Sequence, residues 1–269
     1  MLRDITLGQY YQADSIIHKL DPRVKLATTL IFIISLFVFD NIAGYAVAAI
    51  FLIIVIKLSK VPFKFMVKGM KAIVFLLLLT VICNLLLTPG KPVVTFWKLT
   101  ITKEGLRLAG LMAVRLSFLI IGSSIMTLTT TPNQLTDAME KMMGPLKKIK
   151  VPVHEIAMMM SIALRFIPIL LEETDKIMKA QIARGADFES GNLVKKAKSM
   201  VPLLVPLFIS AFRRANDLAM AMEARCYRGG EHRTKMKPLH YEHRDYIAYA
   251  IVACYLAAGI AAGKIVGML

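Results

Sequence analysis

Long apolar runs alternate with short polar segments along most of the chain. Residues 26–39 and 42–56 are apolar and are separated by two polar residues. Each run is shorter than the roughly 20 residues that a membrane-crossing helix needs, so we expect the pair to form a helical hairpin. A third run covers 72–88, a fourth about 108–131, and the last 246–263. The pattern therefore predicts about five membrane spans.

The segment between the fourth and fifth spans has a different pattern. Its apolar runs at 156–171 and 200–212 contain prolines, and each is followed by a charged amphipathic stretch. Short interrupted runs are more typical of buried or interfacial helices than of spans. We expect two long helices here, at about 152–184 and 193–226, lying beneath the membrane. A helix of about 33 residues would reach roughly 50 Å.

These patterns predict an all-α, polytopic membrane protein in three parts. Residues 1–132 would form an N-terminal transmembrane region with four spans. Residues 133–245 would form a helical cytoplasmic region, and residues 246–269 a C-terminal transmembrane span.

Charge predicts the orientation in the membrane, because cytoplasmic loops collect Lys and Arg. The 57–71 loop carries five lysines, while the turn at residues 40–41 carries no basic residue. This places the N-terminus and the basic 133–245 segment in the cytoplasm and the C-terminus outside. The 91–107 segment has four Lys or Arg and argues mildly against this orientation; we expect it to make an interfacial excursion.

Composition narrows the classes of partner. The chain is 57% hydrophobic and carries a net charge of +16, against about 45–50% apolar residues in soluble domains. The lipid bilayer accounts for the apolar excess, and cytoplasmic loops account for the charge. We expect no nucleic-acid partner, since no basic motif with interleaved aromatic residues is present. Three scattered cysteines predict neither disulfides nor a thiolate metal site.

Motifs for chemistry are nearly absent. The chain has no P-loop and no GxSxG motif, and a zincin pattern that starts at His154-Glu155 has Met158 where the second histidine belongs. His232, His240 and His243 lie close in sequence, and we expect them in a solvated turn rather than a metal site. We therefore expect no catalytic residue, no metal and no cofactor in this chain.

Two helix ends share a pattern of Ala-x-x-Ala-Arg followed by a small residue. The arginines, Arg184 and Arg225, stand 41 positions apart. Arginine at a helix C-terminus complements the helix dipole and projects a planar, charged fork. Small neighbours leave room for another protein, so the two ends could dock on two acidic grooves. On spacing alone, ordinary terminal charges with Gly185 as a helix stop explain the pattern as well.

Three further stretches resemble one family across essentially the whole chain. They are His18–Leu26, Ala163–Pro168, and Arg213-Arg214-Ala215 leading to Ala221–Arg225. Together they resemble the transmembrane T component of energy-coupling factor transporters, which are bacterial and archaeal ABC-type importers of vitamins and metal ions. The resemblance implies a bacterial cell membrane location and a complex with two ATPases and a small membrane subunit that captures the substrate. It also implies that ATP and Mg²⁺ bind only in the ATPases.

The resemblance further implies roles for individual residues. The family's paired Ala-Arg-Gly motifs correspond to Ala183-Arg184-Gly185 and Ala224-Arg225-Cys226, each docking on one ATPase. Cys226 departs from the commoner glycine; it is also small, so we expect docking to survive with less backbone freedom. The 156–171 and 200–212 stretches fit a surface for the substrate-capturing subunit. Its expected contacts are Met158, Met159, Ile162, Leu203 and Leu207, with core packing as the alternative for the methionines.

An autonomous membrane protein, either a secondary carrier or an insertase, is the alternative function. A carrier should place ionisable groups in mid-membrane, but Arg115 is the only charge well within the fourth run. The sequence does not indicate the substrate, because the capturing subunit sets it in this family. Nor does it indicate whether one or several such subunits share this chain.

Overall fold

The computed structural model describes residues 10–39, 41–66, 73–96, 99–186, 188, 192–230, 236 and 238–268. The chain divides into two compact units. The first, here called the framing unit, comprises Gly8–Ala138 and Leu239–Leu269. The second, here called the inserted unit, comprises Met139–Pro238 together with the first seven residues. The three sequence-based domain limits stay a prediction.

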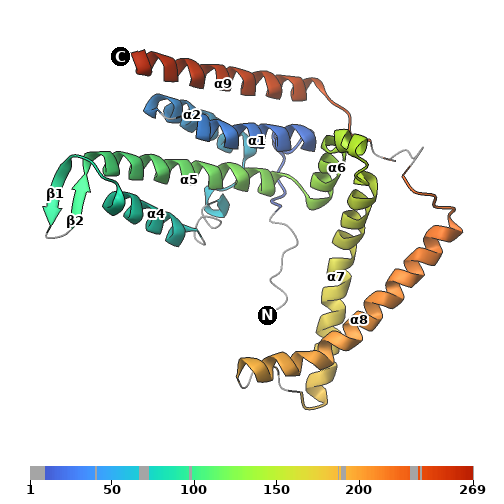
Figure 1. The fold of residues 1–269 in the computed structure, drawn as a ribbon. Helices are drawn as coiled ribbons and strands as arrows, with labels where there is room; N and C mark the ends of the chain where they lie inside the picture. The colour runs from blue at the N-terminus through green and yellow to red at the C-terminus, as the bar shows by residue number, and fades with distance from the viewer. Residues whose placement is uncertain are drawn as a thin grey trace. The chain divides into compact units, whose positions relative to one another are not determined.

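Where the structure describes it, the framing unit is helical apart from one β-hairpin. Its elements are α1 (Pro22–Val38), α2 (Ile42–Ser59), α4 (Val74–Leu87), β1 (Pro92–Phe96), β2 (Leu99–Thr102), α5 (Lys103–Thr129), the first part of α6 (Pro132–Met142) and α9 (His243–Met268). In Figure 1, α1 and α2 lie between α5 and α9, and α4 packs along α5. The unit is therefore closed by a helix from the far end of the chain.

The segment expected to make an interfacial excursion folds as the β-hairpin and the start of α5, and its place at the interface stays a prediction. Strands β1 and β2 pair antiparallel, with an irregularity between Pro92 and Val94. The run of β-branched residues in 93–95 favours this extended structure. Thr102 is the N-cap of α5, and its hydroxyl accepts a hydrogen bond from the Gly105 amide at 3.0 Å.

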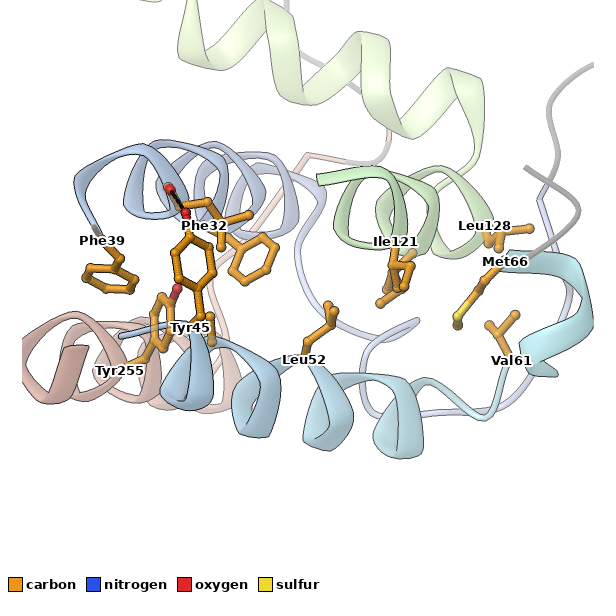
Figure 2. Close-up of a cluster of buried hydrophobic side chains, with 12 residues drawn as sticks. Phe32, Phe39, Tyr45, Leu52, Val61, Met66, Ile121, Leu128 and Tyr255 are labelled. Carbon is orange, nitrogen blue, oxygen red and sulfur yellow. Dashed lines mark hydrogen bonds between the residues drawn. The ribbon is translucent and has the colours of Figure 1, made fainter. Parts of the chain in front are cut away.

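The core of the framing unit combines aromatic side chains, such as Phe32 and Tyr255, with aliphatic ones, such as Leu52 and Ile121 (Figure 2). The rings of Phe51 and Tyr255 stack with centroids 4.5 Å apart, and the Phe32 ring lies 5.9 Å from that of Phe51. The helices α1 and α2, which were expected to form a hairpin, each pack on both α5 and α9. This packing buries one stripe of each helix.

Arg115, the charge expected in mid-membrane, is hydrogen-bonded inside this unit. Its Nε donates to the Tyr45 hydroxyl at 2.7 Å, and that hydroxyl donates to the Leu36 carbonyl at 3.2 Å. A charge within an apolar region is costly unless polar groups satisfy it. The arginine therefore joins α5 to α2 and α1.

The architecture confirms an all-α polytopic membrane protein. Within the described residues, four helices are long and apolar enough to cross a membrane: α2, α5, α7 (Val153–Ala183) and the His243–Gly263 part of α9. The predicted runs at 26–39 and 72–88 form the shorter helices α1, of 17 residues, and α4, of 14 residues. Helix α7 was expected beneath the membrane. By length and composition it could instead cross the membrane, because the helix continues through Arg165 and Pro168 without a break.

Parts of the loops used to predict orientation lie outside the described residues. They are residue 40 of the first turn, residues 67–72 of the lysine-bearing loop, and residues 97–98 of the hairpin. His232 of the expected histidine-bearing turn also lies outside them. The orientation of the chain in the membrane stays a prediction.

Candidate functional site

Two long helices dominate the inserted unit. After a short 3-10 helix, η2 (Gly144–Ile149), come α7, of 31 residues, and α8 (Leu193–Ala224), of 32 residues. Their bounds confirm the helices expected at 152–184 and 193–226. At 1.5 Å per residue, each is about 45–50 Å long.

The two helices cross at a polar contact. Glu173 of α7 accepts a hydrogen bond from the Ser210 hydroxyl at 2.8 Å and forms an ion pair with Arg214. Further along α7, the Gln181 side-chain amide donates to the Pro202 carbonyl at 3.3 Å. That carbonyl is available because Pro206, four residues later, has no N–H to donate to it. The prolines of α8 thus create part of the contact, and α8 bends in the same region (Figure 1).

The contacts also fix the relative direction of the helices. Position 173 pairs with 210 and position 181 with 202, so the helices run antiparallel past each other. Arg184 lies 11 residues beyond Glu173 on α7, and Arg225 lies 15 residues beyond Ser210 on α8. The two C-terminal ends therefore extend from opposite sides of the crossing (Figure 1). They form two separate attachment points.

Helix α7 ends in a Schellman motif. Gly185 has φ +88°, its N–H donates to the Ile182 carbonyl at 2.9 Å, and the Ala186 N–H donates to the Gln181 carbonyl at 2.9 Å. This left-handed residue turns the chain away and satisfies the last carbonyls of the helix. Arg184 occupies the C-cap position and is exposed. Its charge lies at the negative end of the helix dipole.

Helix α8 ends with the same geometry although a cysteine replaces the glycine. Cys226 has φ +55°, its N–H donates to the Glu223 carbonyl at 2.8 Å, and the Tyr227 N–H donates to the Met222 carbonyl at 3.0 Å. Arg225 is the exposed C-cap residue. The repeated sequence pattern therefore corresponds to a repeated structure. Because Cys226 bears a Cβ, its left-handed conformation costs about 1–2 kcal/mol more than glycine would.

The small residues of both motifs leave the arginines accessible. Ala183 and Gly185 flank Arg184, Ala224 and Cys226 flank Arg225, and all four are exposed. No bulky side chain precedes or follows either guanidinium along the chain. A partner could approach each helix end closely and pair with its guanidinium.

An exposed apolar stripe runs along one face of α8. Its members recur at three- and four-residue spacing, which places them on one side of the helix. Phe208 is 62% and Phe212 68% exposed. The full stripe, here called the α8 stripe, comprises Val201, Leu204, Val205, Phe208, Ile209 and Phe212. A surface of this kind marks a protein or membrane contact.

The α8 stripe corrects part of the predicted substrate-subunit surface. Leu203 is only 5% exposed and Leu207 is half-buried, and helical spacing puts both on the face that carries Ser210 and Arg214 toward α7. They therefore support the crossing instead of forming the surface. On α7, Met159 is exposed while Met158 and Ile162 are half-buried. The apolar runs at 156–171 and 200–212 therefore each contain both buried and exposed side chains.

The histidines of the described region do not form a metal site. In the part of the chain that the structure describes, no group of three His, Cys, Asp or Glu is placed to hold a metal ion. His154, which begins the incomplete zincin pattern, instead pairs through Nδ1 with the Glu140 carboxylate at 2.9 Å.

Comparison with known proteins supplies the family. The CbiQ family model, described as cobalt transport protein, matches residues 13–236. The "Energy-coupling factor transporter transmembrane protein EcfT" of Clostridium kluyveri is 59% identical over 250 residues, covering 92% of this chain and 93% of that protein. The chain belongs to this family. The proteins of the same name from Thermosediminibacter oceani and Bacillus subtilis are 54% identical (96% of this chain, 97% of that protein) and 48% identical (91% and 93%).

Family membership confirms the resemblance drawn from the three sequence stretches. The chain is a transmembrane component of an energy-coupling factor transporter and is located in a membrane. Sequence analysis did not predict the α8 stripe. A signal for it was present, because Ser210 and Arg214 lie seven and eleven residues after Leu203 and mark the face turned toward α7.

The left-handed residue at the end of α8 generates a prediction. Cys226→Gly should stabilise the last turn of α8 by about 1 kcal/mol, because glycine adopts positive φ without a Cβ penalty. Cys226→Val should weaken the same turn, since a β-branched residue is a poor fit there. Hydrogen exchange of the final α8 amides should slow in the first variant and quicken in the second.

The matched control is Gly185→Ala at the end of α7, which should quicken exchange there and leave α8 unchanged. Equal exchange in Cys226→Gly and the parent protein would contradict the account of this helix end.

Proposed function

We propose that this chain couples two ATPase subunits to a small membrane subunit that captures a vitamin or another micronutrient. Arg184 and Arg225 would each dock in an acidic groove of one ATPase. Closure of the ATPase pair would then move α7 and α8, and their apolar surface would reorient the capturing subunit. ATP and Mg²⁺ bind in the partners under this proposal, and the chain itself is non-catalytic.

One observation carries the proposal: two separate helix ends have the same capped geometry and the same exposed arginine. A charge that serves only the helix dipole needs no repeated left-handed cap and no small neighbours on both sides. Two equal ends on opposite sides of one crossing suit two equal partners. The antiparallel crossing, held by Glu173, Ser210 and Arg214, would let motion at one end reach the other.

The α8 stripe supports the second half of the proposal. Together with the exposed Met159 of α7, it is assigned to contact the substrate-capturing subunit. Flexible and apolar side chains suit a surface that accepts more than one partner. We further propose that the N-terminus and the inserted unit are cytoplasmic and that the C-terminus is outside, in a bacterial cell membrane.

The autonomous carrier or insertase is less well supported. Such a protein needs its own polar path, and a carrier should hold ionisable groups for it in mid-membrane. The mid-helix charge of α5, Arg115, is committed to Tyr45. Activity of the purified chain alone would favour this alternative.

Charge reversal at both helix ends tests ATPase docking. Arg184→Glu/Arg225→Glu should abolish both ATPase pull-down and substrate uptake, because truncating one partner of a buried charge pair already costs about 2–5 kcal/mol. Arg→Lys at both positions should rescue poorly, since the ammonium lacks the planar fork. Membrane expression should remain, since the changes lie at exposed helix ends.

The matched control reverses two other exposed charges on the same helices, Lys179→Glu/Lys198→Glu, and should keep both ATPases. If the double arginine variant also keeps both ATPases and still supports uptake, the arginines only complement helix dipoles and the proposal fails.

Charges placed in the α8 stripe test the other partner. Val205→Asp/Phe208→Asp should release the substrate-capturing subunit from the purified complex, because two desolvated carboxylates oppose apolar contact. The ATPases should stay bound. Lys196→Asp, an exposed α8 position on the face away from the stripe, should retain all subunits. Retention of the capturing subunit by the double variant would contradict this surface assignment.

A further inference from the structure

Three helix termini meet at a buried polar cluster in the framing unit. They are the C-terminus of α5 and the N-termini of α1 and α9. The charged side chains at this point are almost fully buried, with Asp245 at 2% and Lys25 at 5% exposed. Buried charges are kept only where they are paired or hydrogen-bonded.

Lys25 ties α1 to the end of α5. Its ammonium donates to the Thr129 carbonyl at 2.9 Å and to the His18 carbonyl at 2.9 Å. Thr129 is the last residue of α5, so a positive charge lies at the negative end of that helix and satisfies one of its orphan carbonyls. The neighbouring Leu128 carbonyl accepts from the Tyr11 N–H at 2.9 Å.

Asp245 ties the start of α9 to the start of α1. One carboxylate oxygen accepts from the Asp21 N–H at 2.9 Å and the other from the Glu242 N–H at 2.8 Å. Asp21 in turn caps α1 by accepting from the Arg23 N–H at 2.8 Å. The Arg23 guanidinium lies 3.9 Å above the Tyr241 ring. Each acid thus lies at the positive end of a helix dipole.

The segment before α1 packs into the same cluster. His18 Nε2 lies 2.9 Å from the Tyr11 carbonyl and Nδ1 lies 2.6 Å from the Ser15 hydroxyl. Burial, assisted by the charge of Lys25, lowers the pKa of His18 below its usual value. The cluster therefore combines the His18 imidazole and the Asp21–Arg23 ion pair with two buried charges, Lys25 and Asp245, that are hydrogen-bonded to backbone groups.

The position of this cluster in the chain gives it a role. The inserted unit leaves the framing unit after Ala138, shortly beyond Thr129, and returns at Leu239, shortly before Asp245. We propose that Lys25, Asp21 and Asp245 are positioning residues. They would hold together the end of α5, near which the chain leaves the framing unit, and the start of α9, near which it returns. Motion of α7 and α8 then moves α5 and α9 together. This inference rests on the proposed coupling function.

Loss of this connection should uncouple transport from ATP hydrolysis. In proteoliposomes containing this chain, both ATPases and the capturing subunit, Lys25→Met should lower substrate uptake per ATP hydrolysed several-fold. ATPase pull-down and ATP hydrolysis should persist, because Arg184 and Arg225 are unchanged. Asp245→Asn, which keeps only one acceptor oxygen, should have a smaller effect in the same direction. Lys19→Met, at an exposed lysine paired with Asp14, should leave the ratio unchanged.

An unchanged ratio in Lys25→Met would overturn the proposal. So would a parallel fall of hydrolysis and uptake, because that result means the residue supports only the fold. A second measurement separates this inference from the proposed function. In the isolated chain, Lys25→Met should speed hydrogen exchange at the end of α5 and at the start of α9 together. Faster exchange at only one of them contradicts this connection even if no ATPase binds this chain.

Discussion

The hydrogen bond from the Asp21 N–H to the Asp245 carboxylate joins positions 224 residues apart and closes the framing unit. Two further hydrogen bonds join α9 to the same region, between the Ser35 and Tyr255 hydroxyls at 2.6 Å and from the Asn41 side-chain amide to the Gly263 carbonyl at 3.0 Å, and the Asp245 contact sets the depth of α9 at its first turn. The buried carboxylate fixes that depth, because it must accept from both Asp21 and Glu242. Everything between Ala138 and Leu239 then becomes an insertion whose two ends are anchored together.

The caps of the two long helices are the second constraint, and they determine the geometry of the inserted unit. A left-handed residue stops each helix, satisfies its final carbonyls and leaves an arginine at the tip. Because α7 and α8 cross antiparallel, the two tips extend from opposite sides of the crossing. The polar contacts of Glu173 and Gln181 with α8 hold that arrangement, so the spacing of the two tips depends on the crossing.

The sequence predicted the elements of this architecture that depend on local pattern. Apolar runs predicted α2, α5 and α9, and the repeated Ala-x-x-Ala-Arg pattern predicted two equivalent helix ends. It could not predict features that depend on distant pairing. Ser210 and Arg214 marked a polar side of α8 near the end of the 200–212 run, but their pairing with Glu173 of α7 emerges only from the fold. Similarly, the His18–Leu26 stretch indicated the family, but nothing local indicated that Asp21 meets Asp245. Arg165 and Pro168 seemed to interrupt α7, yet the helix continues through both.

Photo-crosslinking from the residue just beyond each helix cap tests the coupling account most directly. A photoreactive amino acid at Ala186 would report on the end of α7, and one at Tyr227 on the end of α8. The account predicts that both positions capture an ATPase subunit, and that the same probe at Ile53, exposed on the candidate membrane span α2, captures none. Capture from only one helix end, or from neither, would contradict the claim that the two ends are equivalent docking points.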